Sequence, residues 1–367
     1  MPSLFDPIQL GAIRAPNRIL MAPLTRGRNT RDHVPTPMMT DYYRQRASAG
    51  LIVAEASGIS LQGLGWPYAA GIWNTEQTAG WRTIVDAVHE AGGRIVSQLW
   101  HMGRAVHPSM PGRGQPVSAS ATTQPGLDHT YDGKQPFVEA RPLRRDEIPG
   151  LLEDYRHAAR NALAAGFDGV QIHSANGYLL DQFLRDSTNF RQDEYGGSIE
   201  NRIRLLREVT SAVAEVAGAD RTSVRLSPNG DRRGVNDSHP EPLFEAAASA
   251  LSQIGIAFLD IREPGYDGTF GQADRPPIAP LIRKAFKGPL ILNTDYDQAK
   301  AERALNEGQA DAIGFGRPFL ANPDLPHRFA HGIPLTPDDM ATWYSRDEKG
   351  YLDYPAASEA RSLQAAG

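Results

Sequence analysis

The sequence of 367 residues contains no cysteine. A protein without cysteine has no disulfide, no thiol nucleophile and no iron–sulfur cluster held by thiolates. No stretch reaches the roughly 18 consecutive apolar residues of a membrane span, and the N-terminus lacks a basic segment followed by an apolar run. The Gly-x-Gly-x-x-Gly motif that opens a dinucleotide-binding βαβ unit is also absent. We therefore expect a cytoplasmic protein without a dedicated dinucleotide-binding domain.

Charge of one sign is not concentrated anywhere in the sequence. Lys and Arg number 38 and Asp and Glu number 43, which gives a net charge of -5, and the basic residues are scattered without runs. Nucleic acids and anionic membranes are bound by clusters of basic residues. We predict a small-molecule partner, with no nucleic acid, no membrane and no metal site.

Short apolar runs recur along the chain and are separated by segments with helical spacing of their apolar residues. Strands that alternate with helices in this way form a parallel sheet, and eight such units close into a barrel. We expect the α/β fold class, a (β/α)8 TIM barrel, and a single domain over residues 1–367. The predicted strands are 19–21, 51–54, 95–99, 170–172, 223–226, 258–261, 290–292 and 312–314, and the clearest predicted helices are 80–91, 151–165, 202–217 and 297–307.

Two segments lie outside this repeat. Residues 4–17 precede the first strand and contain the turn residues Gly11 and Pro16, so we expect an N-terminal hairpin that closes the barrel bottom. Residues 107–142 follow the third strand, are rich in Pro, Gly, Ser and Thr, and have little periodicity. Long loops in compact domains are usually functional or disordered. We interpret this one as a capping loop over the active site, with a flexible surface excursion as the alternative.

Three hydrogen-bonding side chains follow the fourth predicted strand. His173, Asn176 and Tyr178 come after an apolar run that ends at Ile172. The carboxyl ends of parallel strands are where ligands bind in barrels. His173 and Asn176 can donate to one oxygen atom, and Tyr178 can deliver a proton nearby. The alternative is that these side chains satisfy loop backbone groups or pack in the core.

Six segments beyond this strand carry a recognisable pattern. They are 179–184, 187–191, 193–198, 200–202, 316–325 and 350–355. The pattern resembles the signature of the old yellow enzyme family of flavin-dependent ene-reductases, and the resemblance runs from Leu4 to about Pro355. It implies tightly bound, non-covalent FMN, NADPH or NADH as the reductant, and an activated alkene as the substrate, such as an enone, maleimide or nitroalkene.

The resemblance also implies roles for individual side chains. His173 and Asn176 hydrogen-bond the carbonyl or nitro oxygen of the alkene, hydride adds to the β carbon, and Tyr178 protonates the α carbon from the opposite face. Net addition of hydrogen is therefore expected to be trans. Because no separate nicotinamide domain is predicted, nicotinamide and alkene use one site in turn, which predicts ping-pong kinetics.

The flavin ring is expected at the ends of the early and middle strands. In the resemblance, Gln98 and Arg225 face the pyrimidine side, and Thr25 hydrogen-bonds the C4 oxygen. A fixed positive charge there stabilises reduced flavin. The alternatives are a structural salt bridge for Arg225 and a local backbone hydrogen bond for Thr25. The other predicted cofactor contacts here are Pro23, Ala56 and His173.

The phosphate of FMN is expected between the loops after the last two strands, which most often hold phosphate in this fold. Thr294 and Asp295 follow the seventh strand, and Gly316 and Arg317 follow the eighth. Gly316 permits close backbone approach, and Arg317 supplies donors to the anion. Residues 293–295 depart from the glycine-containing version of the family. The acidic Asp295 hinders phosphate binding unless its side chain turns away.

Five aromatic residues are candidates for the wall of the substrate pocket, each with core packing as the alternative. They are Trp66, Tyr68, Trp100, Phe270 and Tyr351. No heptad or exposed apolar repeat is visible, so we expect a monomer or a homodimer, and the sequence does not decide between them.

Two other functions are compatible with a barrel of this kind. A metal-free aldolase or isomerase acting on a phosphorylated substrate needs a Schiff-base lysine at a strand end. A barrel that only stores flavin or another ligand predicts a coloured protein without turnover, and His173, Asn176 and Tyr178 argue against it. The lysines of the chain, none of which falls at a predicted strand end, are Lys134, Lys284, Lys287, Lys300 and Lys349.

Overall fold

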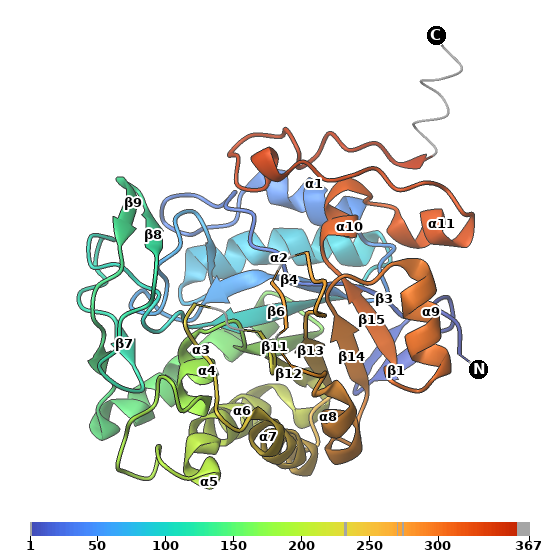
Figure 1. Ribbon diagram of the computed structural model, residues 1–367. Coiled ribbons are helices and arrows are strands. Elements are labelled where there is room, and N and C mark those ends of the chain that lie inside the picture. The colour runs from blue at the N-terminus through green and yellow to red at the C-terminus, as the bar shows by residue number, and fades with distance from the viewer. Residues whose placement is uncertain (1, 231–232, 270, 274, 358–367) are drawn as a thin grey trace.

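The computed structural model describes residues 2–230, 233–269, 271–273 and 275–357. At its centre, eight parallel strands close into a barrel (Figure 1). They are β3 (Ile19–Met21), β4 (Ile52–Gly58), β6 (Ile95–Trp100), β11 (Gly169–Ser174), β12 (Thr222–Leu226), β13 (Phe258–Arg262), β14 (Leu290–Asn293) and β15 (Ala312–Phe315). The barrel closes because β3 pairs with β15 on one side and with β4 on the other. A further short strand, β5 (Ala70–Gly71), pairs with β4. The predicted (β/α)8 barrel and its eight strands are confirmed.

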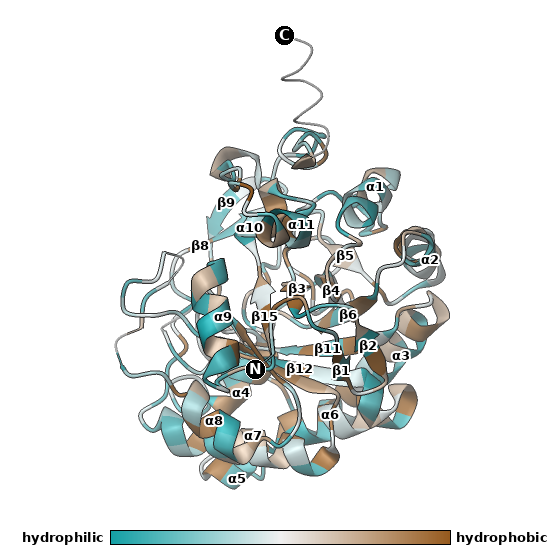
Figure 2. Ribbon diagram, turned by 90° about the vertical axis from the view of Figure 1, so that its right-hand side faces the viewer, coloured by the Kyte–Doolittle hydropathy of each residue, from teal (hydrophilic) through white to brown (hydrophobic). Residues whose placement is uncertain are grey.

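Every residue of the eight barrel strands is buried. Helices cover one face of these strands and side chains fill the other, so the sequence marks them by continuous apolar runs rather than by alternation. Figure 2 shows the hydrophobic colour on the central strands, whereas the surrounding helices carry both colours.

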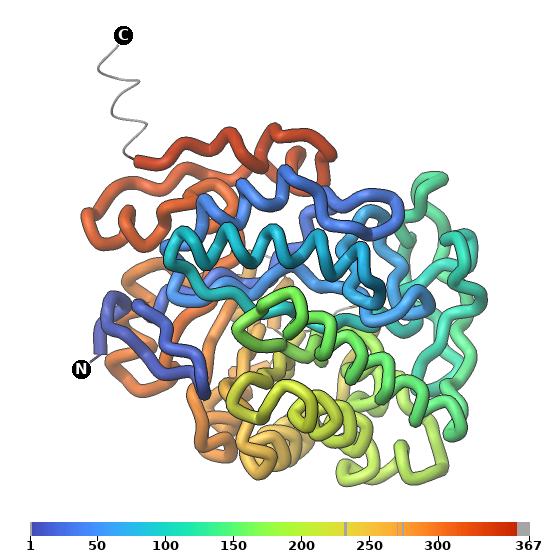
Figure 3. The backbone as a smooth tube through the Cα atoms, turned by 180° about the vertical axis from the view of Figure 1, so that it is seen from behind, coloured from blue at the N-terminus to red at the C-terminus, as the bar shows by residue number. Residues whose placement is uncertain are grey.

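Helices form the outer layer of the barrel, as the view from behind shows (Figure 3). The four clearest predicted helices are present as α2 (Thr75–Glu90), α3 (Ile148–Ala164), α6 (Arg204–Ala217) and α9 (Gln298–Asn306). Helix α2 begins after Asn74, whose Oδ1 accepts a hydrogen bond from the backbone N of Gln77 at 2.9 Å, a favourable N-cap. The remaining helices are α1 (Pro37–Gln45), α4 (Leu179–Leu184), α5 (Ile199–Arg202), α7 (Pro240–Ile254), α8 (Ala279–Ala285), α10 (Arg317–Ala321) and α11 (Leu325–Ala330), with the 3-10 helices η1 (Arg145–Glu147), η2 (Ala219–Arg221) and η3 (Met340–Thr342).

The predicted N-terminal hairpin is confirmed. Strands β1 (Ile8–Leu10) and β2 (Ile13–Ala15) pair antiparallel, and Figure 3 shows them in dark blue near the N-terminus. Their apolar side chains form one buried cluster with residues of the barrel strands, including Leu20 and Phe258. The turn requires glycine, because Gly11 has φ +60° and an added Cβ would lie 2.0 Å from the carbonyl oxygen of Asp220. The hairpin thus closes the end of the barrel opposite to the strands' carboxyl ends.

The segment 107–142 has regular structure that the sequence did not predict. Strand β8 (Leu127–Thr130) pairs antiparallel with β9 (Gly133–Pro136), and β7 (Val117–Ser118) pairs parallel with β10 (Arg141–Pro142). These strands are too short for their periodicity to be recognised in the sequence. Of the helices that the structure describes, none is both long enough and apolar enough to cross a membrane.

Candidate active site

A cavity of about 690 Å³ opens at the carboxyl end of the barrel strands. Small-molecule pockets usually measure about 300–1,000 Å³. Each barrel strand, or the residue directly after it, contributes to the wall. The contributions are Ala22 after β3, Ala56 in β4, Gln98 and Trp100 in β6, His173 in β11, Arg225 in β12, Arg262 in β13, Asn293 in β14, and Gly314 and Phe315 in β15.

Most residues that the sequence nominated lie in this wall, although they come from distant parts of the chain. The structure therefore brings the nominated catalytic and cofactor residues together around one cavity. Those in the wall are Pro23, Thr25, Ala56, Trp66, Gln98, Trp100, His173, Asn176, Tyr178, Arg225, Thr294, Asp295, Gly316 and Arg317.

Two nominated aromatic residues lie outside the wall, which corrects the prediction. Tyr351 is fully buried and stacks on Tyr42, with the ring centroids 4.1 Å apart. Tyr68 packs edge-to-face against Tyr131 at 5.1 Å, and the guanidinium of Arg346 lies 3.6 Å from its ring centroid. Both side chains hold neighbouring segments together, because an aromatic ring buries equally well against the core and against a ligand. Phe270 lies outside the described residues.

The capping segment 107–142 contributes no residue to the wall. It reaches the cavity indirectly, because His129 of β8 packs against the wall residue Trp66 with the ring centroids 5.2 Å apart. The segment therefore supports the rim of the cavity rather than lining it.

His173, Trp100 and Tyr178 form an aromatic cluster at one end of the cavity. The ring centroid of Tyr178 lies 5.0 Å from that of His173 and 4.9 Å from that of Trp100, in both cases edge-to-face. Arg233 donates a hydrogen bond from Nη2 to Oη of Tyr178 at 2.9 Å. The cluster fixes the ring of Tyr178 by packing, and it places the hydroxyl where it can exchange a proton with a ligand.

His173 is neutral in this site. Burial lowers the pKa of His173 well below its ordinary value, and the positive charges of Arg225 and Arg233 lower it further. Nδ1 of His173 accepts a hydrogen bond from the backbone N of Ala175 at 3.3 Å. Because Nδ1 is the acceptor, the ring hydrogen is assigned to Nε2, which can donate to a ligand oxygen.

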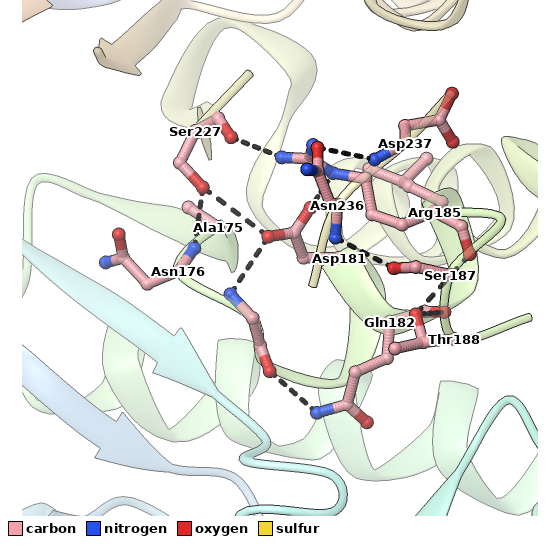
Figure 4. Close-up of polar contacts among 12 residues, drawn as sticks. Ala175, Asn176, Asp181, Gln182, Arg185, Ser187, Thr188, Ser227, Asn236 and Asp237 are labelled. Atoms are coloured by element: carbon pink, nitrogen blue, oxygen red, sulfur yellow. Dashed lines mark hydrogen bonds and ion pairs between the residues drawn. The ribbon is translucent and has the colours of Figure 1, made fainter. Parts of the chain in front are cut away.

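Asn176 occupies a tight turn that a buried polar network supports (Figure 4). Its φ is 58°, a left-handed conformation that asparagine tolerates. The backbone N of Asn176 donates to Oγ of Ser227 at 2.7 Å, and the backbone N of Gly177 donates to Oδ2 of Asp181 at 2.9 Å. Asp181 pairs with Arg185 at 2.8 Å, and both side chains are 2% exposed. The Asn176 side chain points away from this network, toward the cavity that it lines.

A polar layer crosses the barrel interior beneath the cavity. Gln98 donates from Nε2 to Oε1 of Gln171 at 2.7 Å, and Gln171 donates to Oδ2 of Asp260 at 3.3 Å. Arg225 pairs with Asp260 and donates from Nη2 to Oδ1 of Asn293 at 2.8 Å. Burial raises the pKa of Asp260, although the charge of Arg225 acts in the opposite direction. The salt-bridge alternative for Arg225 is therefore present, and the same guanidinium also lines the cavity.

The opposite end of the cavity is formed by the loops after β14 and β15. Thr294 has φ 111° and Asp295 has φ 54°, so the loop takes a backbone conformation that favours glycine. Asp295 does not turn away from Arg317, because its Oδ1 lies 2.5 Å from Nη2 of Arg317. Thr269 also donates from Oγ1 to Asp295 at 2.5 Å. Partial burial acts to raise the pKa of Asp295, but the hydrogen bonds from Thr269 and the charge of Arg317 hold it below its ordinary value.

The wall also contains residues that the sequence reasoning missed. Arg262 and Asn293 end otherwise apolar strands, so the rule that singled out Arg225 could have found them. Lys300 lies in helix α9, and the others lie in loops or in the segment after α11, where no periodicity signals proximity to the barrel mouth. The missed residues include Arg26, Arg233, Arg262, Asp267, Asn293, Lys300, Trp343 and Tyr344.

Comparison with known proteins decides which chemistry this geometry serves. The model of the NADH:flavin oxidoreductase / NADH oxidase family matches residues 3–336. The solved structure of the old yellow enzyme homologue from Zymomonas mobilis is 62% identical, with a TM-score of 0.95 over 96% of this chain and 99% of that chain. The chain belongs to the old yellow enzyme family of flavin oxidoreductases.

Other relatives agree with this assignment. Morphinone reductase, solved in complex with tetrahydroNAD, is 46% identical, with a TM-score of 0.92 over 97% of this chain and 98% of that chain. Chanoclavine-I aldehyde reductase of Penicillium roqueforti (strain FM164) is 42% identical over 370 residues, which cover 98% of each chain. 12-Oxophytodienoate reductase 2 of Arabidopsis thaliana is 40% identical over 359 residues, covering 96% of this chain and 95% of the relative. This old yellow enzyme family member is an FMN-dependent oxidoreductase that uses a nicotinamide reductant.

The cavity of this family member fits FMN. Among the described residues, Nε1 of Trp100, Oδ1 of Asn176 and Oγ1 of Thr294 are buried in the cavity wall without a hydrogen-bond partner. Such orphaned polar groups are costly unless a ligand or water satisfies them. The guanidinium groups of Arg225 and Arg317 lie in the same wall and suit the two negatively charged parts of reduced FMN.

Proposed function

We propose that this enzyme reduces C=C bonds that an adjacent carbonyl or nitro group activates, as in enones, maleimides and nitroalkenes. The observation that carries the proposal is the convergence of His173, Asn176 and Tyr178 at one end of a cavity whose wall also holds Arg225 and Arg317. When bound, FMN supplies the hydride that the alkene receives and that NADH or NADPH replenishes.

His173 and Asn176 bind the activating oxygen of the alkene. The Nε2–H of neutral His173 and the side-chain amide of Asn176 supply two donors without a positive charge on the ring. As hydride reaches the β carbon, negative charge moves onto this oxygen and strengthens both hydrogen bonds. Donors that are already in place stabilise this developing charge without reorganisation.

Tyr178 is the proton donor to the α carbon. Its ring is held edge-to-face by Trp100 and His173, so the hydroxyl has a defined position beside the bound oxygen. A positioned general acid typically contributes about 10² to 10⁴-fold to the rate. Proton delivery from the face opposite to the hydride gives trans addition across the double bond.

Residues on two sides of the cavity hold FMN in this proposal. Gln98, Arg225 and Thr25 bind the pyrimidine part of the ring system, and the positive charge of Arg225 stabilises the reduced form. Arg317 donates to the phosphate once its ion pair with Asp295 has given way. The wall residues Pro23, Ala56, Thr294 and Gly316 complete the cofactor site, and Trp66 and Trp100 form the substrate wall.

The aldolase or isomerase alternative is not favoured. Lys300 lines the cavity, but it belongs to helix α9 rather than to a strand end. Three further properties stay predictions: one domain over residues 1–367, a monomeric or homodimeric state, and a cytoplasmic location. The preference between NADPH and NADH is also a prediction to be measured.

A visible absorption spectrum of the purified protein, followed under anaerobic conditions by reduced nicotinamide and then by 2-cyclohexenone, tests the proposal. We expect a flavin spectrum that the nicotinamide bleaches and the enone restores. Bleaching without recovery by enones, maleimides or nitroalkenes rules out alkene reduction and favours the flavin-storage alternative. Titration with NADPH and NADH in parallel gives the coenzyme preference from the two bleaching rates.

A further inference from the structure

Arg233 occupies an unusual position in the loop after β12. It has φ 59°, a left-handed conformation that is uncommon for residues other than glycine. Its Nη2 lies 2.9 Å from Oη of Tyr178, and its Cζ lies 4.8 Å from the centroid of the Tyr178 ring. The side chain is half-buried and lines the cavity. Arg233, in a strained backbone conformation, thus places its guanidinium beside the hydroxyl of Tyr178, which we assign as the proton donor.

A second arginine holds the backbone of this turn. Arg104, which follows β6, is buried and donates from Nη2 to the carbonyl oxygens of Arg233 and Gly234 at 2.8 Å and 3.0 Å. Gly234 also has a positive φ, 68°. Strained conformations persist only where surrounding contacts determine them, and they are frequent at functional sites. The turn is therefore built to direct the Arg233 side chain.

The positive charge of Arg233 is not neutralised by an ion pair with a carboxylate among the described residues. Its guanidinium donates a hydrogen bond to Tyr178. Asp128 of β8 is the buried carboxyl group that senses this charge. Burial raises the pKa of Asp128 to about 7, with Arg233 acting in the opposite direction. Near neutral pH the carboxyl group of Asp128 is therefore only partly ionised, so its negative charge offsets the positive charge of the guanidinium only in part.

We propose that Arg233 is a further catalytic residue, which stabilises the negative charge left on Oη of Tyr178 when the phenol gives its proton to the substrate. The inference rests on the proposed function of Tyr178. Because Arg233 donates to a lone pair of Oη, the O–H of Tyr178 remains available to the cavity.

The proposed step adds one hydride and one proton to the alkene. Hydride forms the new C–H bond at the β carbon, the π pair of the double bond forms the C–H bond at the α carbon with the phenolic proton, and the O–H bond of Tyr178 breaks. The phenolate is held by Arg233 until it takes a proton from solvent. A charge-assisted hydrogen bond of this kind corresponds to roughly 10- to 100-fold in rate.

The experiment compares two substrates in the FMN-loaded enzyme. Reoxidation of reduced flavin by 2-cyclohexenone requires a proton at the α carbon, whereas reoxidation by β-nitrostyrene can leave the charge on the nitro oxygens of a stable nitronate. We expect Arg233→Gln to slow the enone reaction roughly 10- to 100-fold and the nitroalkene reaction by no more than about twofold. Arg233→Lys keeps the charge and should recover part of the enone rate.

Two controls separate this role from a structural one. Arg31→Gln removes an exposed arginine that lies 4.4 Å from the ring centroid of Tyr131, outside the cavity wall, and should leave both rates unchanged. Equal slowing of both substrates by Arg233→Gln, or loss of bound flavin from that variant and from Arg233→Lys, means that Arg233 only maintains structure, and overturns the proposal.

A double-mutant comparison separates the failure of this inference from the failure of the proposed function. In Tyr178→Phe there is no phenolate to stabilise, so adding Arg233→Gln should slow the enone reaction no further. If Tyr178→Phe alone leaves the enone rate unchanged, the proposed role of Tyr178 is wrong, and this inference falls with it. If Tyr178→Phe slows the enone reaction and Arg233→Gln does not, only the role of Arg233 is wrong.

Discussion

The two ends of the cavity differ in how completely they are prepared for a ligand. At the end where we propose that the substrate binds, here called the substrate end, His173 and Asn176 line the cavity, and a buried polar network with the Asp181–Arg185 pair supports the turn of Asn176. At the end formed by the loops after β14 and β15, where we propose that the phosphate binds and which we call the phosphate end, Arg317 is already paired with Asp295. Binding at a preorganised end costs little free energy. Binding at an end whose charges already pair with each other requires that an ion pair breaks first. Substitutions at the substrate end should therefore change rates, and substitutions at the phosphate end should change cofactor affinity.

The largest expected effect is on the proton donor. Tyr178→Phe removes the hydroxyl but keeps the ring between Trp100 and His173, so flavin binding and reduction by nicotinamide should stay within about twofold. The oxidation of reduced flavin by 2-cyclohexenone should slow by about 10² to 10⁴-fold. Stopped-flow absorbance measures the two half-reactions separately. Tyr68→Phe, outside the cavity wall, is the matched control and should change neither rate.

The next largest effect is expected at the oxygen-binding donors. Asn176→Gly removes one donor and tolerates the φ of 58°, so the supporting turn is kept. Loss of one donor to a developing oxyanion typically costs about 10²- to 10³-fold, and kcat/KM for the enone should fall by this amount. If kcat/KM falls less than about threefold while FMN affinity drops, Asn176 serves the cofactor and the contrast between the two ends is wrong.

At the phosphate end, Arg317→Ala should weaken FMN binding. Removing a charge-assisted donor to the phosphate corresponds to roughly a 10- to 100-fold rise in Kd. Titration of the FMN-free protein with FMN, followed by quenching of flavin fluorescence, gives this value. Rates of the fully loaded variant should remain near those of the wild type, and a large loss of enone reduction at saturating FMN contradicts the division of roles.

Substitution of Asp295 should act in the opposite direction and more weakly. Asp295→Asn removes the carboxylate that competes for Arg317, and asparagine tolerates the φ of 54°. FMN should bind up to about tenfold more tightly, and the gain should shrink at high salt because the pair is partly exposed to solvent. Weaker FMN binding by Asp295→Asn means that Asp295 holds Arg317 in the productive position instead of competing with the phosphate.

The smallest expected effect is on pH dependence at the substrate end. Because burial and two arginines keep the pKa of His173 well below its ordinary value, its ring stays neutral between about pH 6 and pH 8. Affinity for a neutral enone should be constant over this range, measured as the Kd from the enone dependence of flavin reoxidation. A change centred near pH 6.5 shows that His173 titrates normally and is not the neutral donor described above.

Much of this architecture could be read from the sequence. The eight barrel strands are buried on both faces, so each leaves a mainly apolar run in the sequence, and several of these runs contain or end in a polar residue. Gln98, His173 and Arg225 stand out by their polarity in or at the end of apolar runs, and the resemblance to the family supplies their expected roles. The short strands of the capping segment were missed, because strands of two to four residues carry too little periodicity.

The errors have a common physical cause. Tyr351 was placed in the pocket wall, but its ring stacks on Tyr42, a contact between positions that lie far apart in the sequence. Arg233 was overlooked, although it lines the cavity, because its direction depends on Arg104, which is 129 positions away. The sequence leaves open whether the side chain of Asp295 turns away from the phosphate site, and in the structure it pairs with Arg317.

The sequence by itself determined the barrel, the strand ends that face the cavity and the family, because burial periodicity and motif order are local properties of the chain. Only the tertiary structure decided which nominated side chains meet. In the tertiary structure the guanidinium of Arg233 donates a hydrogen bond to Tyr178, and Arg317 forms an ion pair with Asp295 at the phosphate end. Contacts between side chains of distant segments depend on how the whole barrel packs, and no local pattern encodes them.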